Sequence, residues 1–292
     1  MSADDAHPFR CIAVLGPGLI GGSLIRAVRA RFSGARLTAW ARREEVISLL
    51  RDAEGLGDGA TGDISKAVEG ADLIVLAMPT GAMADVIEQL VDFPVGSDVL
   101  VTDVGSVKGP VESKVGNLVR KKGANFIGSH PMAGSEKTGL KFADSELFDD
   151  APVILTPSMG NEVEGALVNR LREFWEGVGA RVSQMSVGEH DRLVASISHL
   201  PHLLAAALVR VVLGQTPEAG TFSGGGFRDT TRVSAGPEEM WAGILSDNSE
   251  AVSYQLGAFI DELESWKHAL DTLDRDQLHG FLSQARKLRE SL

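Results

Sequence analysis

An apolar run followed at once by three spaced glycines constrains the fold of this chain more than any other stretch. Residues 11–15 predict a buried strand, and an alanine-rich helical pattern covers 24–32. Between them, Gly16, Gly18 and Gly21 have G-x-G-x-x-G spacing. The first glycine permits a tight turn, the second leaves the backbone open to a pyrophosphate, and the third lets helix and strand pack closely. Because the start of a helix attracts phosphate, this stretch predicts a dinucleotide site.

Short apolar runs and helical patterns then alternate as far as residue 186. We predict further strands at 36–40, 73–78, 98–103, 125–128, 152–156 and 180–184, and a helix over 162–177. This alternation is typical of an α/β fold with a doubly wound, mainly parallel, Rossmann-type sheet. Ligands of such sheets bind beyond the carboxyl ends of the strands. The glycine turn, Ser106 and His130 should therefore lie close together.

The second part of the chain shows no strand pattern. Helical periods cover 187–212, 237–270 and 274–288, and Pro201 should kink or divide the first of them. A glycine-rich loop is expected at 220–227. We therefore predict a dinucleotide-binding domain over 1–186 and an α-helical substrate and dimerisation domain over 187–292. The many apolar residues of the helical part favour a homodimer.

Composition excludes several classes of protein. The chain has 292 residues, enough for two domains, and a net charge of −12, which argues against binding nucleic acid. Its one cysteine, Cys11, can form neither an internal disulfide nor a zinc cluster. Neither a leader sequence nor a long uncharged apolar run is evident, so we expect a cytoplasmic protein without a membrane partner.

The residues after the second predicted strand bear on the choice of cofactor. An NAD-binding fold carries an acid here for the ribose 2′-hydroxyl, but this chain has Ala41, followed by Arg42 and Arg43. Guanidinium groups attract a 2′-phosphate, which favours NADP over NAD. The alternative is a pair of solvated surface arginines.

His130 is the leading candidate for chemistry. It follows a predicted strand in a segment rich in glycine and serine, and histidine accepts protons near neutral pH. Ser106, at the end of the neighbouring strand, could hydrogen-bond His130 or a substrate hydroxyl. The alternatives are a structural histidine and a serine that only caps a helix.

Polar residues of the helical part offer substrate contacts. His199 and His202 share a helix face, but without cysteines or an H-E-x-x-H motif they do not predict a metal site. Arg228 and Arg232 flank Asp229 and could clamp a carboxylate, form a salt bridge with Asp229, or do both. Motifs of hydrolases and kinases are absent.

Five motifs, in order along the chain, resemble the prephenate/arogenate dehydrogenase family of tyrosine biosynthesis. They are GPGLIGGS at 16–23, VGSVK at 104–108, GSHPMAG at 128–134, SHLPH at 198–202 and GFRDTTR at 226–232. The resemblance implies oxidative decarboxylation of a cyclohexadienol, with hydride transfer to NAD(P)+. It also implies a dinucleotide-binding domain followed by a helical dimerisation domain. The departure from the family is Ala41-Arg42-Arg43 in place of the usual acid.

The resemblance also implies roles for individual residues. His130 is the expected catalytic base, hydrogen-bonded to Ser106, and Arg232 is expected to bind a substrate carboxylate. His202 and Trp241 are expected on the substrate side. Glu136, Asp191 and Asp229 are expected to shape access to the site. The expected cofactor residues are Gly16, Gly18, Leu19, Ile20, Gly21, Arg42, Arg43, Pro79 and Ser106.

Two alternative functions remain at this point. One is another two-domain hydroxy-acid dehydrogenase, of the 6-phosphogluconate or 3-hydroxyisobutyrate type, although those enzymes use a helical-domain lysine that the segment around 199–202 lacks. The other is a non-catalytic NADP-binding dimer. The sequence also leaves open whether the substrate is prephenate or arogenate, and whether tyrosine inhibits the protein.

Overall fold

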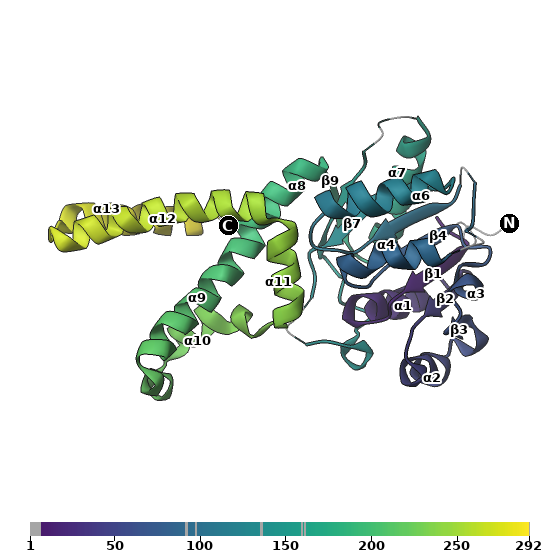
Figure 1. Cartoon of the computed structure of the whole chain (residues 1–292), viewed down its shortest axis with the longest axis horizontal. Helices are drawn as coiled ribbons and strands as arrows, with labels where there is room; N and C mark the ends of the chain where they lie inside the picture. The colour runs from purple at the N-terminus through teal and green to yellow at the C-terminus, as the bar shows by residue number, and fades with distance from the viewer. Residues whose placement is uncertain are drawn as a thin grey trace.

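A parallel sheet covered by helices forms the first half of the molecule, and helices alone form the second (Figure 1). The computed structural model describes residues 7–90, 93–96, 98–134, 137–158, 160 and 162–291. The main sheet has the order β3-β2-β1-β4-β5-β6, and all its neighbouring strands are parallel. Its strands are β1 (Cys11–Leu15), β2 (Arg36–Trp40), β3 (Ala60–Thr61), β4 (Leu73–Leu76), β5 (Leu100–Asp103) and β6 (Asn125–Phe126). The predicted fold class is confirmed.

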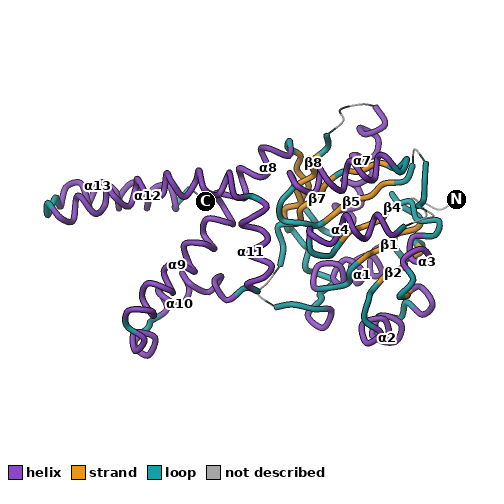
Figure 2. The backbone as a smooth tube through the Cα atoms, viewed as in Figure 1, coloured by secondary structure: helices purple, strands orange, loops and turns teal. Residues whose placement is uncertain are grey.

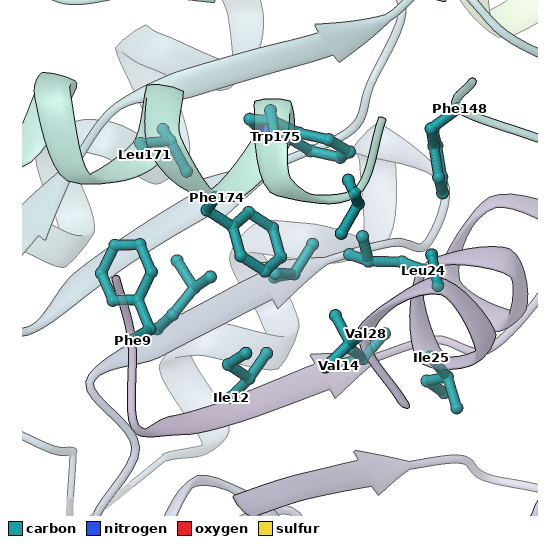
Figure 3. Packing of buried hydrophobic residues seen from close by; sticks show 14 of the residues in the cluster. Phe9, Ile12, Val14, Leu24, Ile25, Val28, Phe148, Leu171, Phe174 and Trp175 are labelled. Atoms are coloured by element: carbon teal, nitrogen blue, oxygen red, sulfur yellow. The ribbon is translucent and has the colours of Figure 1, made fainter. Parts of the chain in front are cut away.

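Helices cover both faces of this sheet, as Figure 2 shows. They are α1 (Leu19–Arg31), α2 (Glu44–Asp52), α3 (Ile64–Val68), α4 (Thr80–Gln89), α5 (Gly109–Val111), the π-helical η3 (Glu112–Gly116), α6 (Asn117–Lys121) and α7 (Glu162–Gly177). Alternate residues of β1 point to opposite faces, so Ile12 and Val14 join one core and Ala13 and Leu15 the other. Figure 3 shows the first core, in which Phe174 and Trp175 of α7 pack over β1.

A second, smaller sheet carries the predicted base. It contains β7 (Gly128–Pro131), β8 (Pro152–Thr156) and β9 (Arg181–Gln184), with β7 antiparallel to β8 and β8 parallel to β9. The single strand predicted over 125–128 is therefore wrong. The chain leaves the main sheet after β6 and pairs with β8 instead, which a pattern of apolar residues cannot reveal.

The helical half begins with α8 (Val187–Val194), which a capping box formed by Ser186 and Glu189 starts. It continues with η5 (Ala195–His199), α9 (Leu200–Gln215), η6 (Pro217–Phe222), α10 (Gly225–Thr231), η7 (Arg232–Ala235), α11 (Glu238–Asp247), α12 (Ser249–Asp271) and α13 (Arg275–Arg289). Two predictions are wrong here. The helix expected over 237–270 is divided at Asn248, and most of the loop expected at 220–227 is helical.

Pro201 does not divide the first helix: α8 continues through the π-helical η5 into α9, and Pro201 lies in the first turn of α9. Among the described helices, the continuous span Val187–Gln215 is long and apolar enough, by length and composition, to cross a membrane. This differs from the expectation that no long apolar run occurs. Only 17% of its most apolar window is buried, so the span leaves an apolar surface uncovered in a single copy of the chain.

Candidate active site

The glycine turn has the geometry that the sequence predicts. Gly16 follows β1 with a φ of +93°, and a Cβ there would lie 2.8 Å from the carbonyl oxygen of Ala77. A Cβ on Gly21 would lie 2.5 Å from the carbonyl oxygen of Gly16, whereas one on Gly18 would meet no atom within 4 Å. No side chain caps α1 at Gly18. The first turn of α1 is therefore open to a phosphate, and these residues fit a dinucleotide.

The other expected cofactor residues lie along the same edge of the sheet. Leu19 and Ile20 are in the first turn of α1, Arg42 and Arg43 follow β2, Pro79 lies between β4 and α4, and Ser106 follows β5. The strand order reverses at β1, which pairs with both β2 and β4. Ligands bind at this point in doubly wound sheets.

His130, in β7, is buried against helix α8 of the helical half. Its Nδ1 is 2.8 Å from Nε2 of His190, and Nδ1 of His190 is 2.7 Å from Oδ1 of Asp191. A chain of hydrogen bonds therefore runs from a carboxylate to the expected base. No described residue hydrogen-bonds to Nε2 of His130, so this nitrogen is left for a substrate.

The backbone of the sheet domain holds Asp191 in place. Oδ1 of Asp191 accepts a hydrogen bond from the N–H of Lys108, and Oδ2 accepts one from the N–H of Gly109, both at 2.8 Å. Burial favours a raised pKa for Asp191, but the hydrogen bonds from His190 and these two N–H groups outweigh it and keep the pKa below its ordinary value. Asp191 is therefore ionised at neutral pH.

The surroundings of His130 keep its imidazole neutral. Burial is the largest cause that holds the pKa of His130 well below its ordinary value, and the charges of Lys108, His190 and His199 add to it. An unprotonated imidazole at neutral pH is the form that a general base requires.

Ser106 does not pair with His130 in this structure. Nδ1 of His130 is engaged by His190, and no hydrogen bond between described residues joins Ser106 to either ring nitrogen. Ser106 itself is half-buried in the turn after β5, on the cofactor edge.

An aromatic stack marks the substrate side of the helical half. Trp241 stacks on His202 with ring centroids 3.5 Å apart and an interplanar angle of 11°, and His199 meets the same indole edge-on. The stack needs a glycine at 236, since a Cβ there would lie 2.5 Å from Nε1 of Trp241. Nε2 of His199 and Nδ1 of His202 are buried and have no hydrogen-bond partner among the described residues. The π-helical η5, which carries His199, is a feature that often marks functional sites.

The remaining expected substrate residues are less enclosed. Arg232 is exposed at the start of η7, which packs against α9, the helix that carries His202. Asp229 is exposed on α10 and forms no ion pair with a described residue. Glu136 lies outside the described residues. Among the residues that the structure describes, no group of three or more His, Cys, Asp or Glu side chains is arranged to hold a metal ion.

Sequence reasoning missed an ion pair beneath the site. Lys108 is 1% exposed and Asp103 is 0% exposed, and the ammonium of Lys108 donates to Asp103 and, at 2.7 Å, to the carbonyl oxygen of Ser129. Asp103 also accepts from the N–H of Ser129. These bonds fasten β7, and with it His130, to the end of β5. The only sequence signal was the short spacing of Asp103 and Lys108 after a buried strand.

His190 was also missed. It follows a capping residue in the sequence Glu189-His190-Asp191, so the available signal was a histidine beside an acid in the first turn of a helix. Nothing local shows that this turn faces β7, 60 residues earlier in the chain.

Comparisons with known proteins agree with this arrangement. The family described as "Prephenate dehydrogenase, nucleotide-binding domain" matches residues 26–184, and "Prephenate dehydrogenase, dimerization domain" matches residues 186–284. The chain belongs to the prephenate dehydrogenase family. As a member, it is an NAD(P)-dependent oxidoreductase.

Its relatives match along nearly the whole chain. A cyclohexadienyl dehydrogenase from Zymomonas mobilis is 35% identical over 97% of this chain and 96% of its own. A prephenate dehydrogenase from Bacillus subtilis is 30% identical over 96% of this chain and 76% of its own. The structure of prephenate dehydrogenase from A. aeolicus with hydroxyphenyl propionate and NAD+ has a TM-score of 0.87 at 31% identity, covering 97% of this chain and 98% of that one.

Two further structures are similar to this chain. Synechocystis arogenate dehydrogenase has a TM-score of 0.80 at 29% identity, covering 96% of this chain and 99% of its own. A 3-hydroxyisobutyrate dehydrogenase from Mycobacterium tuberculosis is 13% identical, with a TM-score of 0.52, covering 86% of this chain and 94% of its own. The second likeness is one of fold alone.

Proposed function

We propose that this chain oxidatively decarboxylates prephenate or arogenate with hydride transfer to NADP+, producing 4-hydroxyphenylpyruvate or tyrosine and CO2 in tyrosine biosynthesis. The observation that carries the proposal is His130, an unprotonated imidazole whose Nδ1 is held by His190 and whose Nε2 hydrogen-bonds to no described residue. It lies next to the end of β5, on the side of the sheet where the glycine turn would hold a dinucleotide.

The proposed reaction needs few groups from the protein. The substrate ring carries a hydroxyl on the carbon opposite its ring carboxylate. Nε2 of His130 accepts the proton of this hydroxyl while a hydride leaves the carbon that carries it. A bound nicotinamide would supply the acceptor for the hydride. Loss of CO2 from the opposite carbon leaves its bonding electrons to complete the aromatic ring, and the phenolate oxygen recovers the proton from His130. Aromatisation supplies driving force, so the protein mainly positions groups and moves one proton.

An assay that crosses prephenate and arogenate with NAD+ and NADP+ tests this proposal. We expect turnover of at least one substrate, detected by reduced nicotinamide and by release of CO2 in equal amounts. A protein that binds NADP+ yet reduces it with neither substrate would instead be the non-catalytic dimer, and the proposal would be wrong.

The choice of NADP+ rests on Arg42 and Arg43. Both are exposed after β2, and neither forms an ion pair with a described residue, so both guanidinium groups are available to a 2′-phosphate. We expect NADP+ to bind more tightly than NAD+, and the Arg42→Ala, Arg43→Ala double variant to lose that preference. Titration of both cofactors measures it, with Arg29→Ala, on the neighbouring helix α1, as control. Tighter binding of NAD+ to the unmodified protein would contradict the assignment.

Arg232 is proposed to hold a substrate carboxylate. A chain with a net charge of −12 repels a dianion at long range, so a local cation is needed. We expect Arg232→Ala to raise KM by a factor that corresponds to about 1.5–3 kcal/mol, with unchanged cofactor affinity. Arg232→Lys should recover only part of the loss, because an ammonium lacks the planar fork.

Arg228→Ala is the matched control, since Arg228 is also exposed and lies four residues earlier. It should leave KM unchanged. A normal KM in Arg232→Ala, with a lowered melting temperature, would instead support a purely structural role for Arg232.

The helical half is proposed to form a homodimer of a cytoplasmic protein. Large apolar side chains stay exposed on it in a single chain: Leu208, Val211, Phe222, Ile260, Leu263, Leu270, Leu273, Leu282 and Leu288. Burial of these residues against a second copy would remove them from water. We place the domain boundary between residues 186 and 187, where the last strand has ended and α8 begins.

A further inference from the structure

We infer that Asp191 and His190 are positioning residues that fix the tautomer of His130, so that its Nε2 carries the lone pair. The inference deepens the proposed function and rests on it only where it names His130 as the base. It assigns Asp191 a role beyond the shaping of access that the family resemblance implies, and it gives a role to His190.

The tautomer follows from the two hydrogen bonds of the chain. An ionised carboxylate only accepts, so the proton between Asp191 and His190 is on Nδ1 of His190. Our inference is that this is the one proton on the His190 ring, so its Nε2 accepts. The proton 2.8 Å away must then be on Nδ1 of His130. Nε2 of His130 is left without a proton, which is the form that can accept one.

Asp191, the first residue of this series of hydrogen bonds, is held by both halves of the molecule. Both oxygens of Asp191 accept backbone N–H groups, at Lys108 and Gly109, so the carboxylate cannot rotate away without leaving donors unpaired. Asn248 of the helical half donates at 2.8 Å to the carbonyl oxygen of Asp191. The sheet domain and the helical half thus fix the carboxylate together.

The charges around His130 favour the same role. The ammonium of Lys108, in the segment after β5, opposes a positive charge on His130. The ammonium of Lys108 is bound to Asp103 and to the carbonyl oxygen of Ser129. Once His130 has accepted a proton, Asp191 is therefore the carboxylate that acts on it through His190. The pair both orients the base and stabilises its charged form, as the buried aspartate does in a Ser-His-Asp triad.

The tautomer can be read directly by NMR on the unmodified protein with ¹⁵N-labelled histidine, without any substrate. The signals of His130 are assigned by their loss in His130→Asn. We expect Nδ1 of His130 to carry the proton and Nε2 to carry none. In Asp191→Ala the acceptor for the Nδ1 proton of His190 is lost, so the two hydrogen bonds are free to reverse and the fraction of His130 with its proton on Nε2 should rise. A proton on Nε2 in the unmodified protein would overturn the inference, whatever the activity.

Kinetics provide the second readout. In Asp191→Ala we expect kcat to fall by about 10²-fold, less than the roughly 10⁴-fold seen for the triad aspartate because a second imidazole lies between. Asp52→Ala, which removes an exposed acid at the end of α2, should change nothing.

Variants of His190 provide a test that leaves the hydrogen bonds of Asp191 to the backbone of Lys108 and Gly109 in place. His190→Gln places an amide oxygen near the position of Nε2 and should retain more kcat than His190→Leu, which offers no acceptor. Cofactor titration and circular dichroism confirm that each variant is folded. Equal kcat in the two variants of His190, or an unchanged tautomer in Asp191→Ala, would overturn the inference. Turnover by the unmodified protein separately tests the proposed function.

Discussion

Replacement of His130 by asparagine is expected to lower kcat by about 10²–10⁴-fold, the usual effect of losing a general base, while cofactor affinity stays unchanged. Asparagine suits the test because its amide can donate to His190 from the position of Nδ1 and leaves no base at the position of Nε2. The hydrogen bond of 2.8 Å to His190 is thereby kept, so a loss of rate reports the missing base. Steady-state kinetics and cofactor titration measure the two quantities.

The control is His279→Asn, on the exposed surface of α13, which should change neither kcat nor cofactor affinity. A near-normal kcat in His130→Asn would show that His130 is not the general base.

The pH profile gives an independent check on the same residue. Because burial, Lys108, His190 and His199 hold the pKa of His130 well below 6.5, the base stays unprotonated as the pH falls through 6.5. We expect kcat/KM, which reports the free enzyme, to be level through this range and to decline only at lower pH. A decline centred on 6.5 would show that the imidazole is not shielded as the structure describes.

The glycine turn could be predicted in detail because its geometry is local. Backbone sterics alone dictate that Gly16 takes a positive φ and that Gly21 leaves room for the turn, and both are found. The longer strands of the main sheet could be predicted equally well, because a strand that is buried on both faces appears in the sequence as a run of apolar residues. The two-residue strands β3 and β6 are too short to show any period, so the departure of the chain after β6 was missed.

The site could not be predicted in full because its key contacts join distant segments. His130 was found from its position, but its partner is on a helix 60 residues later. Asn248, where the helix expected over 237–270 is divided, also contacts distant residues: its side-chain amide lies 2.8 Å from the carbonyl oxygen of Asp191 and 3.1 Å from Nδ1 of His199. Lys108 contradicts the general rule that lysines lie at the surface, and only the three-dimensional position of Asp103 explains it.

Lys108→Met is expected to lower the free energy of unfolding by about 3–5 kcal/mol, the usual effect of removing one partner of a buried ion pair. Methionine fills similar space, but it leaves the carboxylate of Asp103, which is 0% exposed, without its cation. The clamp between β5 and Ser129 is lost as well, because the ammonium donates to the carbonyl oxygen of Ser129 at 2.7 Å. Urea denaturation measures the change.

Two matched variants decide between a lost ion pair and a simple loss of packing. In the double variant Lys108→Met, Asp103→Asn, no charge is buried, and the amide oxygen can still accept one of the two N–H groups, of Gly105 and Ser129, that the two carboxylate oxygens of Asp103 accept, so part of the stability should return. Lys66→Met removes an exposed pair with Asp63 and should change stability little. If the double variant were as unstable as Lys108→Met, the uncompensated charge of Asp103 would not be the cause of the lost stability. The loss would then come from the packing of the Lys108 side chain.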